Sequence, residues 1–159
     1  MKISVFYEHI EKACEQTKKP LREVLEYVKA CGIDGVEMDY DELAHDSLDI
    51  LKNLQDAGLV ISSIYGFCHL DIDPEEQKCL DVIDKAAKNG CSRVLLVPGF
   101  FNEADAKIFG ECADDWEKTA AFMQSNQAVQ NITAGLRRAV AYAKEKNVIV
   151  TLEDFDSTL

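Results

Sequence analysis

Short runs of apolar and β-branched residues alternate along the chain with longer stretches in which apolar residues recur every three or four positions. The short runs are typical of strands buried on both faces of a parallel sheet, and the longer stretches are typical of amphipathic helices. Strands that alternate with helices predict an α/β fold whose right-handed crossovers keep the strands parallel. The expected strands lie at residues 1–7, 34–38, 59–65, 93–97 and 148–152.

Proline and capping residues mark the expected helices. Pro20 is expected at the first position of a helix that follows a polar connection from the first strand. The segment 73–76 has an Asp and a Glu at the spacing of a capping box, which predicts that a helix begins there. Residues 100–112 are expected to be irregular, and residues 112–146 to be mainly helical.

Carboxylate and imidazole side chains follow four of the predicted strands. Because the carboxyl ends of parallel strands share one edge of a sheet, these side chains are expected to converge. Hard divalent ions prefer oxygen ligands, so Glu153, directly after the fifth strand, is interpreted as a metal ligand and acid/base group. Glu37, His69 and His9, at the ends of earlier strands, are interpreted as substrate-binding residues.

Each of these residues also has a structural explanation. Glu153 can be a helix cap or a loop carboxylate, and Glu37 can form a structural hydrogen bond. A lone His at a strand end is often a surface loop residue. Four aromatic residues could form an apolar wall on which the ring of a substrate stacks, although aromatic residues at such positions are as often core: Tyr7, Tyr65, Phe67 and Phe100.

The composition limits the classes of partner. With 29 acidic and 17 basic residues the chain carries a net charge of -12, so it is not expected to bind nucleic acid phosphates. No apolar run approaches the roughly 18 to 20 residues that span a bilayer, and no signal-peptide pattern opens the chain. We therefore expect a cytoplasmic protein that does not bind membranes, with most of its six cysteines buried as free thiols.

Two architectures fit five βα units. A doubly wound open sheet is typically complete at 159 residues, whereas a TIM barrel needs eight strands and about 250 residues. The Gly-rich phosphate turn that often marks a dinucleotide-binding sheet is absent from the sequence. Length thus favours the open sheet, and motif content does not.

Three segments resemble the sugar phosphate isomerase/epimerase family, the xylose isomerase-like TIM barrels. They are the glycine-containing turn into the second strand, the fourth strand with its Pro-Gly end, and the helix and fifth strand before Glu153: Cys31–Glu37, Val94–Gly99 and Ala139–Asp156. The resemblance implies a single TIM-barrel-type domain over residues 1–159 that stops after its fifth parallel strand. It also implies that Glu37 faces the barrel mouth.

The resemblance further implies a divalent-metal enzyme, with Mn, Mg, Co or Zn, whose substrate is a sugar, sugar phosphate or polyol. Isomerisation or epimerisation would proceed by proton transfer next to a carbonyl. Glu153 matches the first metal ligand of the family, while the Asp, His and Glu ligands of the sixth to eighth strands have no counterpart in this sequence.

Other functions remain open on the same residues. Within the fold they are a dehydratase of inositol-like ketones and an endonuclease IV-like hydrolase, the second being disfavoured by the charge of -12. A different class is a non-catalytic module that binds a partner or a second copy of itself. Five strands without neighbours leave the first and fifth as open edges, so self-association into a homo-oligomer is expected if nothing else covers them.

Overall fold

The structure is a computed structural model that describes residues 2–45 and 47–153, and within it five parallel strands form one sheet. The strands follow one another in space in the order in which they occur in the chain, and each pairs in parallel with the next. Their bounds are β1 Ser4–Phe6, β2 Gly35–Asp39, β3 Val60–Phe67, β4 Arg93–Val97 and β5 Ile149–Leu152. This is the order of a TIM barrel, because a doubly wound sheet reverses its strand order at a switch point. The expected TIM-barrel-type α/β sheet is confirmed.

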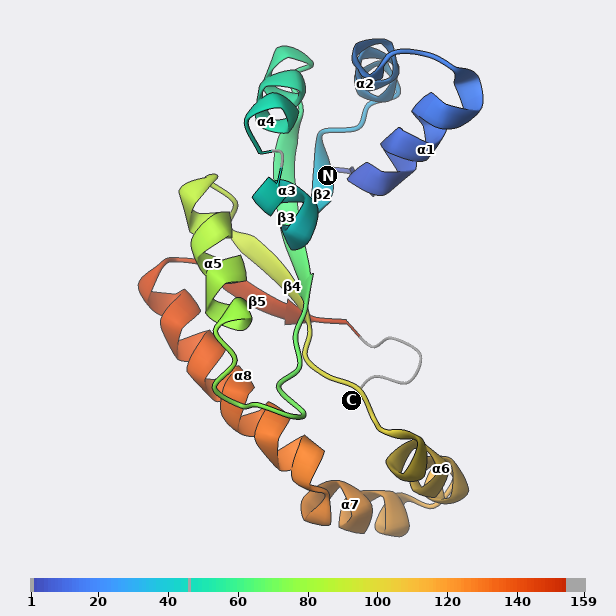
Figure 1. Cartoon of the computed structure of the whole chain (residues 1–159), viewed down its shortest axis with the longest axis vertical. Coiled ribbons are helices and arrows are strands. Elements are labelled where there is room, and N and C mark those ends of the chain that lie inside the picture. The colour runs from blue at the N-terminus through green and yellow to red at the C-terminus, as the bar shows by residue number, and fades with distance from the viewer. Residues whose placement is uncertain (1, 46, 154–159) are drawn as a thin grey trace.

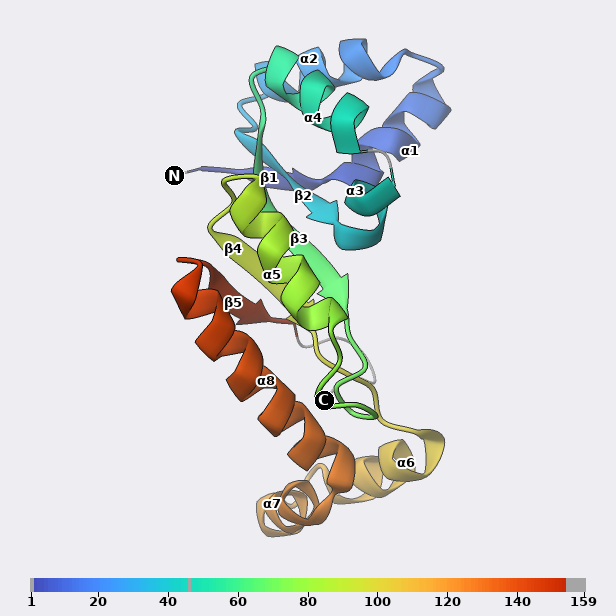
Figure 2. The same cartoon turned by 60° about the vertical axis from the view of Figure 1, so that its left-hand side comes forward.

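Helices connect the strands, and the longest of them pack on one face of the sheet. The helices are α1 Tyr7–Thr17, α2 Leu21–Ala30, α3 Tyr40–His45, α4 Ser47–Asp56, α5 Lys78–Lys88, α6 Glu103–Cys112, α7 Trp116–Ser125 and α8 Gln127–Glu145. α5 packs on β3 and β4, and α8 packs on β5 and beside α5 (Figures 1 and 2). α6 and α7 lie beyond the end of the sheet toward which β3 runs (Figure 1). None of the described helices is long and apolar enough to cross a membrane.

Alternate residues of the strands face the helices and form the core. Val36 and Met38 of β2, Ile64 of β3, and Val94 and Leu96 of β4 are fully buried. They pack with helix residues such as Leu25, Val82, Ile83, Ala139 and Ala143. Since successive side chains of a strand point to opposite faces, the residues between them lie on the second face, which we call the inner face.

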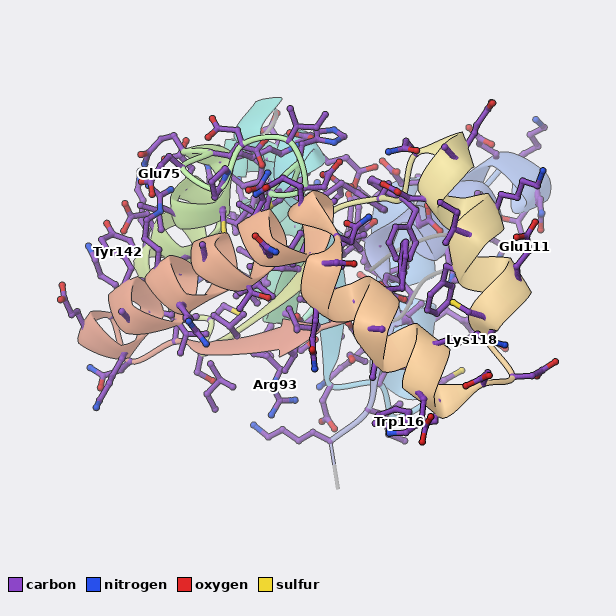
Figure 3. All side chains as sticks on the ribbon, turned by 90° about the horizontal axis from the view of Figure 1, so that it is seen from below. Glu75, Arg93, Glu111, Trp116, Lys118 and Tyr142 are labelled. Carbon is purple, nitrogen blue, oxygen red and sulfur yellow. The ribbon has the colours of Figure 1, made fainter. Side chains whose placement is uncertain are left out.

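The inner face is polar and only partly covered. A common cavity is lined by Ser4, Glu37, Ser63, Arg93 and Thr151, together with Ser62 and Leu95. In Figure 3 the Arg93 side chain projects from the side of the sheet opposite to α8. The sheet therefore has an apolar face under its helices and, around this cavity, a polar face toward the interior of the barrel.

Three expectations about helices are wrong. Residues 7–17 form α1 rather than a polar connection, because Tyr7 and Ile10 recur at helical spacing and bury against the core. Residues 103–112 form α6, which Asn102 caps by accepting hydrogen bonds from two backbone N–H groups. The helix expected from residue 73 begins at Lys78, because the Glu76 carboxylate accepts the backbone N–H of His69 instead of completing a capping box.

All six cysteines are free thiols, and four are buried, as the sequence predicts: Cys68, Cys79, Cys91 and Cys112.

Candidate functional site

Glu153 continues the inner face at the C-terminal end of β5. Its backbone N–H donates to the Leu96 carbonyl at 3.2 Å, so the ladder between β4 and β5 extends to this residue. Thr151, two residues earlier, lines the inner-face cavity with Glu37. Because residues two apart on a strand share a face, alternation continued one residue past β5 predicts that Glu153 projects from the same face, one step nearer the barrel mouth. Its side chain is half-buried.

Glu37 lies deeper in the barrel than a strand-end residue. It is the middle residue of β2, and its Oε1 accepts a hydrogen bond from the Ser4 hydroxyl at 2.8 Å. Asp39, two residues later, occupies the strand end on the same face, where its carboxylate accepts the backbone N–H of Asp41 at 2.7 Å. A substrate-binding role for Glu37 stays a prediction, and its bond to Ser4 is a structural function that it already has.

An aromatic band crosses the sheet at the ends of β1, β3 and β4. It consists of Phe6, Tyr65, Phe67 and Phe100, and each ring contacts the next. The Phe6 and Tyr65 centroids lie 5.5 Å apart, those of Tyr65 and Phe67 6.5 Å apart, and those of Phe67 and Phe100 6.4 Å apart. Of the aromatics singled out in the sequence, Tyr7 is not in the band, because it is the first residue of α1 and is buried in the core with 3% exposure. Phe6 takes its place.

The two predicted histidines lie at opposite ends of the aromatic band. The His9 ring contacts Phe6 edge-on at 5.8 Å, and the His69 ring contacts Phe100 at 5.9 Å. Both side chains are exposed, and each lies near a carboxylate. His9 Nε2 is 3.4 Å from Glu8 Oε1, and His69 Nδ1 is 4.0 Å from Asp71 Oδ1. The imidazoles thus flank an apolar wall at the barrel mouth.

Carboxylates gather next to the β1 and β2 ends of the band. Burial, followed by the negative charges of Glu11, Asp39 and Glu8, raises the pKa of Glu42. Burial, followed by the negative charges of Asp39 and Glu8, also raises the pKa of Tyr65. The Tyr65 hydroxyl therefore stays protonated and can donate a hydrogen bond. Burial and the neighbouring carboxylates at this end of the mouth consequently disfavour the ionised forms of Glu42 and Tyr65.

The described residues do not form a metal site. Residues 2–45 and 47–153 contain no group of three or more His, Cys, Asp or Glu side chains that could hold an ion. Glu153 could supply only one oxygen ligand, and a complete set of ligands would need groups beyond these residues. A carboxylate oxygen is a suitable ligand for a hard divalent cation, but the described residues supply too few such ligands in one place.

Sequence reasoning missed Phe6 and gave Asp71 no role. Both act through contacts between segments far apart in the chain, and no local pattern marks such contacts. Asn102, which follows β4, uses its side-chain oxygen to cap α6.

Comparisons with known proteins agree with this architecture. The family described as "Xylose isomerase-like TIM barrel" matches residues 25–158. Among solved structures, a sugar phosphate isomerase/epimerase from Parabacteroides distasonis aligns at 16% identity with a TM-score of 0.52, over 95% of this chain and 50% of that one. The probable 3-DHS dehydratase AsbF from Bacillus anthracis aligns at 18% identity with a TM-score of 0.59, over 96% and 52%.

A putative xylose isomerase from Rhodospirillum rubrum aligns at 18% identity with a TM-score of 0.51, over 80% of this chain and 46% of that one. At these identities the likeness concerns the fold. The chain spans about half the length of the solved structures that it matches. No curated protein sequence matches it.

Proposed function

Because the chain belongs to the xylose isomerase-like TIM-barrel family, we propose that it contributes to an isomerase or epimerase of a sugar, sugar phosphate or polyol. The reaction is proton transfer next to a carbonyl. The observation that carries the proposal is the inner-face position of Glu153, which alternation from Thr151 sets at the barrel mouth. Catalytic groups of TIM barrels sit at this end of the strands.

The residues of the mouth have distinct proposed roles. The aromatic band offers an apolar wall for the C–H face of a sugar ring, and the Tyr65 hydroxyl can donate to its oxygens. His69 and His9 bind or exchange protons with hydroxyl groups at the two ends of that wall. Glu37, deeper in the barrel, contacts the substrate or orients the side chains next to Glu37 itself.

Glu153 is the acid/base group and one ligand of a divalent metal in this proposal. A bound cation would stabilise the negative charge that develops on a carbonyl oxygen when the adjacent proton leaves. The other ligands would come from groups outside the described residues. Since the chain spans half the length of its structural neighbours, the activity belongs to the complete barrel, whether one chain or more supplies it.

Mn²⁺ tests the Glu153 assignment, because a paramagnetic ion broadens the amide signals of nearby residues even when it binds weakly. Low Mn²⁺ concentrations should broaden Glu153 and Thr151 first, and Glu153→Gln should remove this local effect. Glu145→Gln, at the exposed end of α8, is the matched control and should leave it in place. Broadening confined to the carboxylates around Glu42, or unchanged in Glu153→Gln, would contradict the assignment.

The reaction class has its own test. An isomerase or epimerase exchanges the proton next to the carbonyl, so incubation with aldoses, ketoses and their phosphates in D₂O should place deuterium at that carbon, as seen by proton NMR. Loss of this exchange in Glu153→Gln supports the proposal. Absence of exchange for the whole panel, in a preparation that contains the complete barrel, argues against it.

A self-associating module is the second candidate, because apolar side chains are exposed along the β5 edge. Ile149 is 56% exposed, Leu152 54% and Val140 52%, and Val140 and Ile149 share a groove between α8 and β5. A monomeric globular protein rarely exposes such a contiguous strip. If a second copy covers it, the chain acts by association and not by chemistry.

A further inference from the structure

The loop between β3 and α5 is fastened to the rest of the barrel on both sides of Asp71. The Leu70 N–H donates to the Pro98 carbonyl at 3.0 Å, and the Asp71 carbonyl accepts the side-chain amide of Asn131 at 2.9 Å. These bonds tie the loop to the end of β4 and to α8. The backbone at Asp71 is consequently held in place, and the Asp71 side chain is only 11% exposed.

One oxygen of this carboxylate is buried without a partner. Asp71 Oδ1 accepts no hydrogen bond from any described group. It packs against Gly99, where a Cβ atom would lie 2.6 Å from Oδ1 and 2.9 Å from Asp71 Cβ, so only glycine leaves room for the carboxylate there. A buried carboxylate oxygen without a donor is unfavourable, which points to a donor that approaches it in the working protein.

The imidazole of His69 is a donor close to that oxygen. Its Nδ1 lies 4.0 Å away, too far for a hydrogen bond in this conformation but within reach of a rotation of the ring. The His69 backbone is held independently, because its N–H donates to the Glu76 carboxylate at 2.6 Å and its carbonyl accepts the N–H groups of Ile72 and Asp73. Only the side chain has to move.

We propose that Asp71 is a positioning residue for His69, accepting the Nδ1–H bond and so fixing which nitrogen of the neutral ring carries the proton. The Nε2 lone pair, on the far side of the ring from Asp71, is then the free acceptor. This inference rests on the proposed function for its substrate class, a polyhydroxy compound held against the aromatic band. When a substrate hydroxyl gives its proton to Nε2, the O–H bond breaks, the Nε2–H bond forms, and the Asp71 carboxylate stabilises the resulting imidazolium.

The tautomer of His69 can be read directly in the protein labelled with ¹⁵N-histidine. Long-range ¹⁵N–¹H correlation spectra at about pH 8.5, where an ordinary imidazole is neutral, distinguish Nδ1–H from Nε2–H rings. His69→Gln assigns the signals. The wild-type chain should show His69 mainly as the Nδ1–H form, and Asp71→Asn should shift it toward the Nε2–H form that free imidazoles favour.

Two controls separate positioning from a general structural effect. Asp73→Asn removes a carboxylate from the same loop, one that accepts the Glu75 N–H, and should leave the His69 tautomer unchanged. His9, at the other end of the aromatic band, is an internal reference whose signals should not respond to Asp71→Asn.

Several results would overturn the inference. If His69 in the wild-type protein is mainly in the Nε2–H form, the inference is wrong, and this result needs no variant. If Asp71→Asn folds and its His69 has the same tautomer as the wild type, the inference is also wrong. Because this measurement needs neither metal nor substrate, its failure is distinct from a negative result in the Mn²⁺ or deuterium-exchange experiments.

Discussion

Gly99→Ala is expected to destabilise the protein because the site loop and α8 leave no space for a methyl group at the end of β4. The added Cβ would lie 2.6 Å from Asp71 Oδ1, 2.8 Å from Ile132 Cδ1 and 2.9 Å from Asp71 Cβ. Ile132 can yield by a change of rotamer, but Asp71 Cβ cannot move without its backbone, which the bonds from Leu70 and to Asn131 hold. Gly99 is not among the described glycines with a positive φ, so the effect is steric alone.

The magnitude follows from the cost of overpacking a well-packed region, which is about 1–3 kcal/mol in the free energy of unfolding. Gly110→Ala is the matched control, since it makes the same change within α6 where a Cβ would meet nothing within 4 Å. Replacing an exposed helical glycine by alanine should stabilise the protein by about 0.5–1 kcal/mol. The two variants should therefore differ by about 1.5–4 kcal/mol, with opposite signs relative to the wild type.

Urea unfolding followed by circular dichroism measures both variants against the wild type. A Gly99→Ala protein within about 0.5 kcal/mol of the wild type would refute the close packing of Asp71 on the β4 end. It would also remove the steric basis for the buried carboxylate oxygen. If Gly99→Ala destabilises as expected but folds, its His69 tautomer should shift in the same direction as in Asp71→Asn.

The remaining predictions concern pH and association. Hydrogen bonds from Lys146 and Tyr142 lower the pKa of Asp84, so this carboxylate stabilises the fold above the ordinary carboxyl pKa of about 3.9 and loses that effect as pH falls through its lowered value. Asp84→Asn should lower the free energy of unfolding by under about 1 kcal/mol at pH 7, because the Asp84 side chain is 46% exposed. In urea titrations, this difference between variant and wild type should vanish in acid. If a second copy covers the β5 edge, sedimentation should show that the chain associates and that Val140→Lys weakens the association. Tyr27→Lys, on the exposed surface of α2, is the control and should leave the association unchanged. A chain that stays monomeric at all concentrations contradicts that second function.

The strands could be predicted because their signal is local. Val94–Val97 is a continuous apolar run, and a run of this kind buries between helices and the barrel interior wherever it sits in the chain. α1 was missed for the opposite reason. Its start at Phe6 has no side-chain cap, and charged residues surround the few apolar positions that bury. The helix exists because Tyr7 and Ile10 find a core that the local sequence does not reveal.

The same division applies to the site. Glu153 could be singled out as a candidate because a carboxylate directly after a buried strand is expected at the mouth, and its role stays a prediction. The pairing of Asp71 with Gly99 and the contact of Phe6 with Tyr65 were not, since each joins segments that only the completed fold brings together. Capping logic failed at Glu76 because its carboxylate accepts a competing donor, the His69 N–H.

The polarity of the inner face decides between the two architectures more firmly than chain length does. A doubly wound sheet is covered by helices on both faces, so both faces must be apolar. Here one face carries Ser4, Glu37, Arg93 and Thr151 around a shared cavity, and helices placed over it would strip these groups of water with few partners to replace it. A barrel interior tolerates them, because polar groups on neighbouring strands can pair there, as the Ser4 hydroxyl of β1 and the Glu37 carboxylate of β2 do. Among the described residues, the face of the sheet without a helical cover is thus the one expected to form the barrel interior.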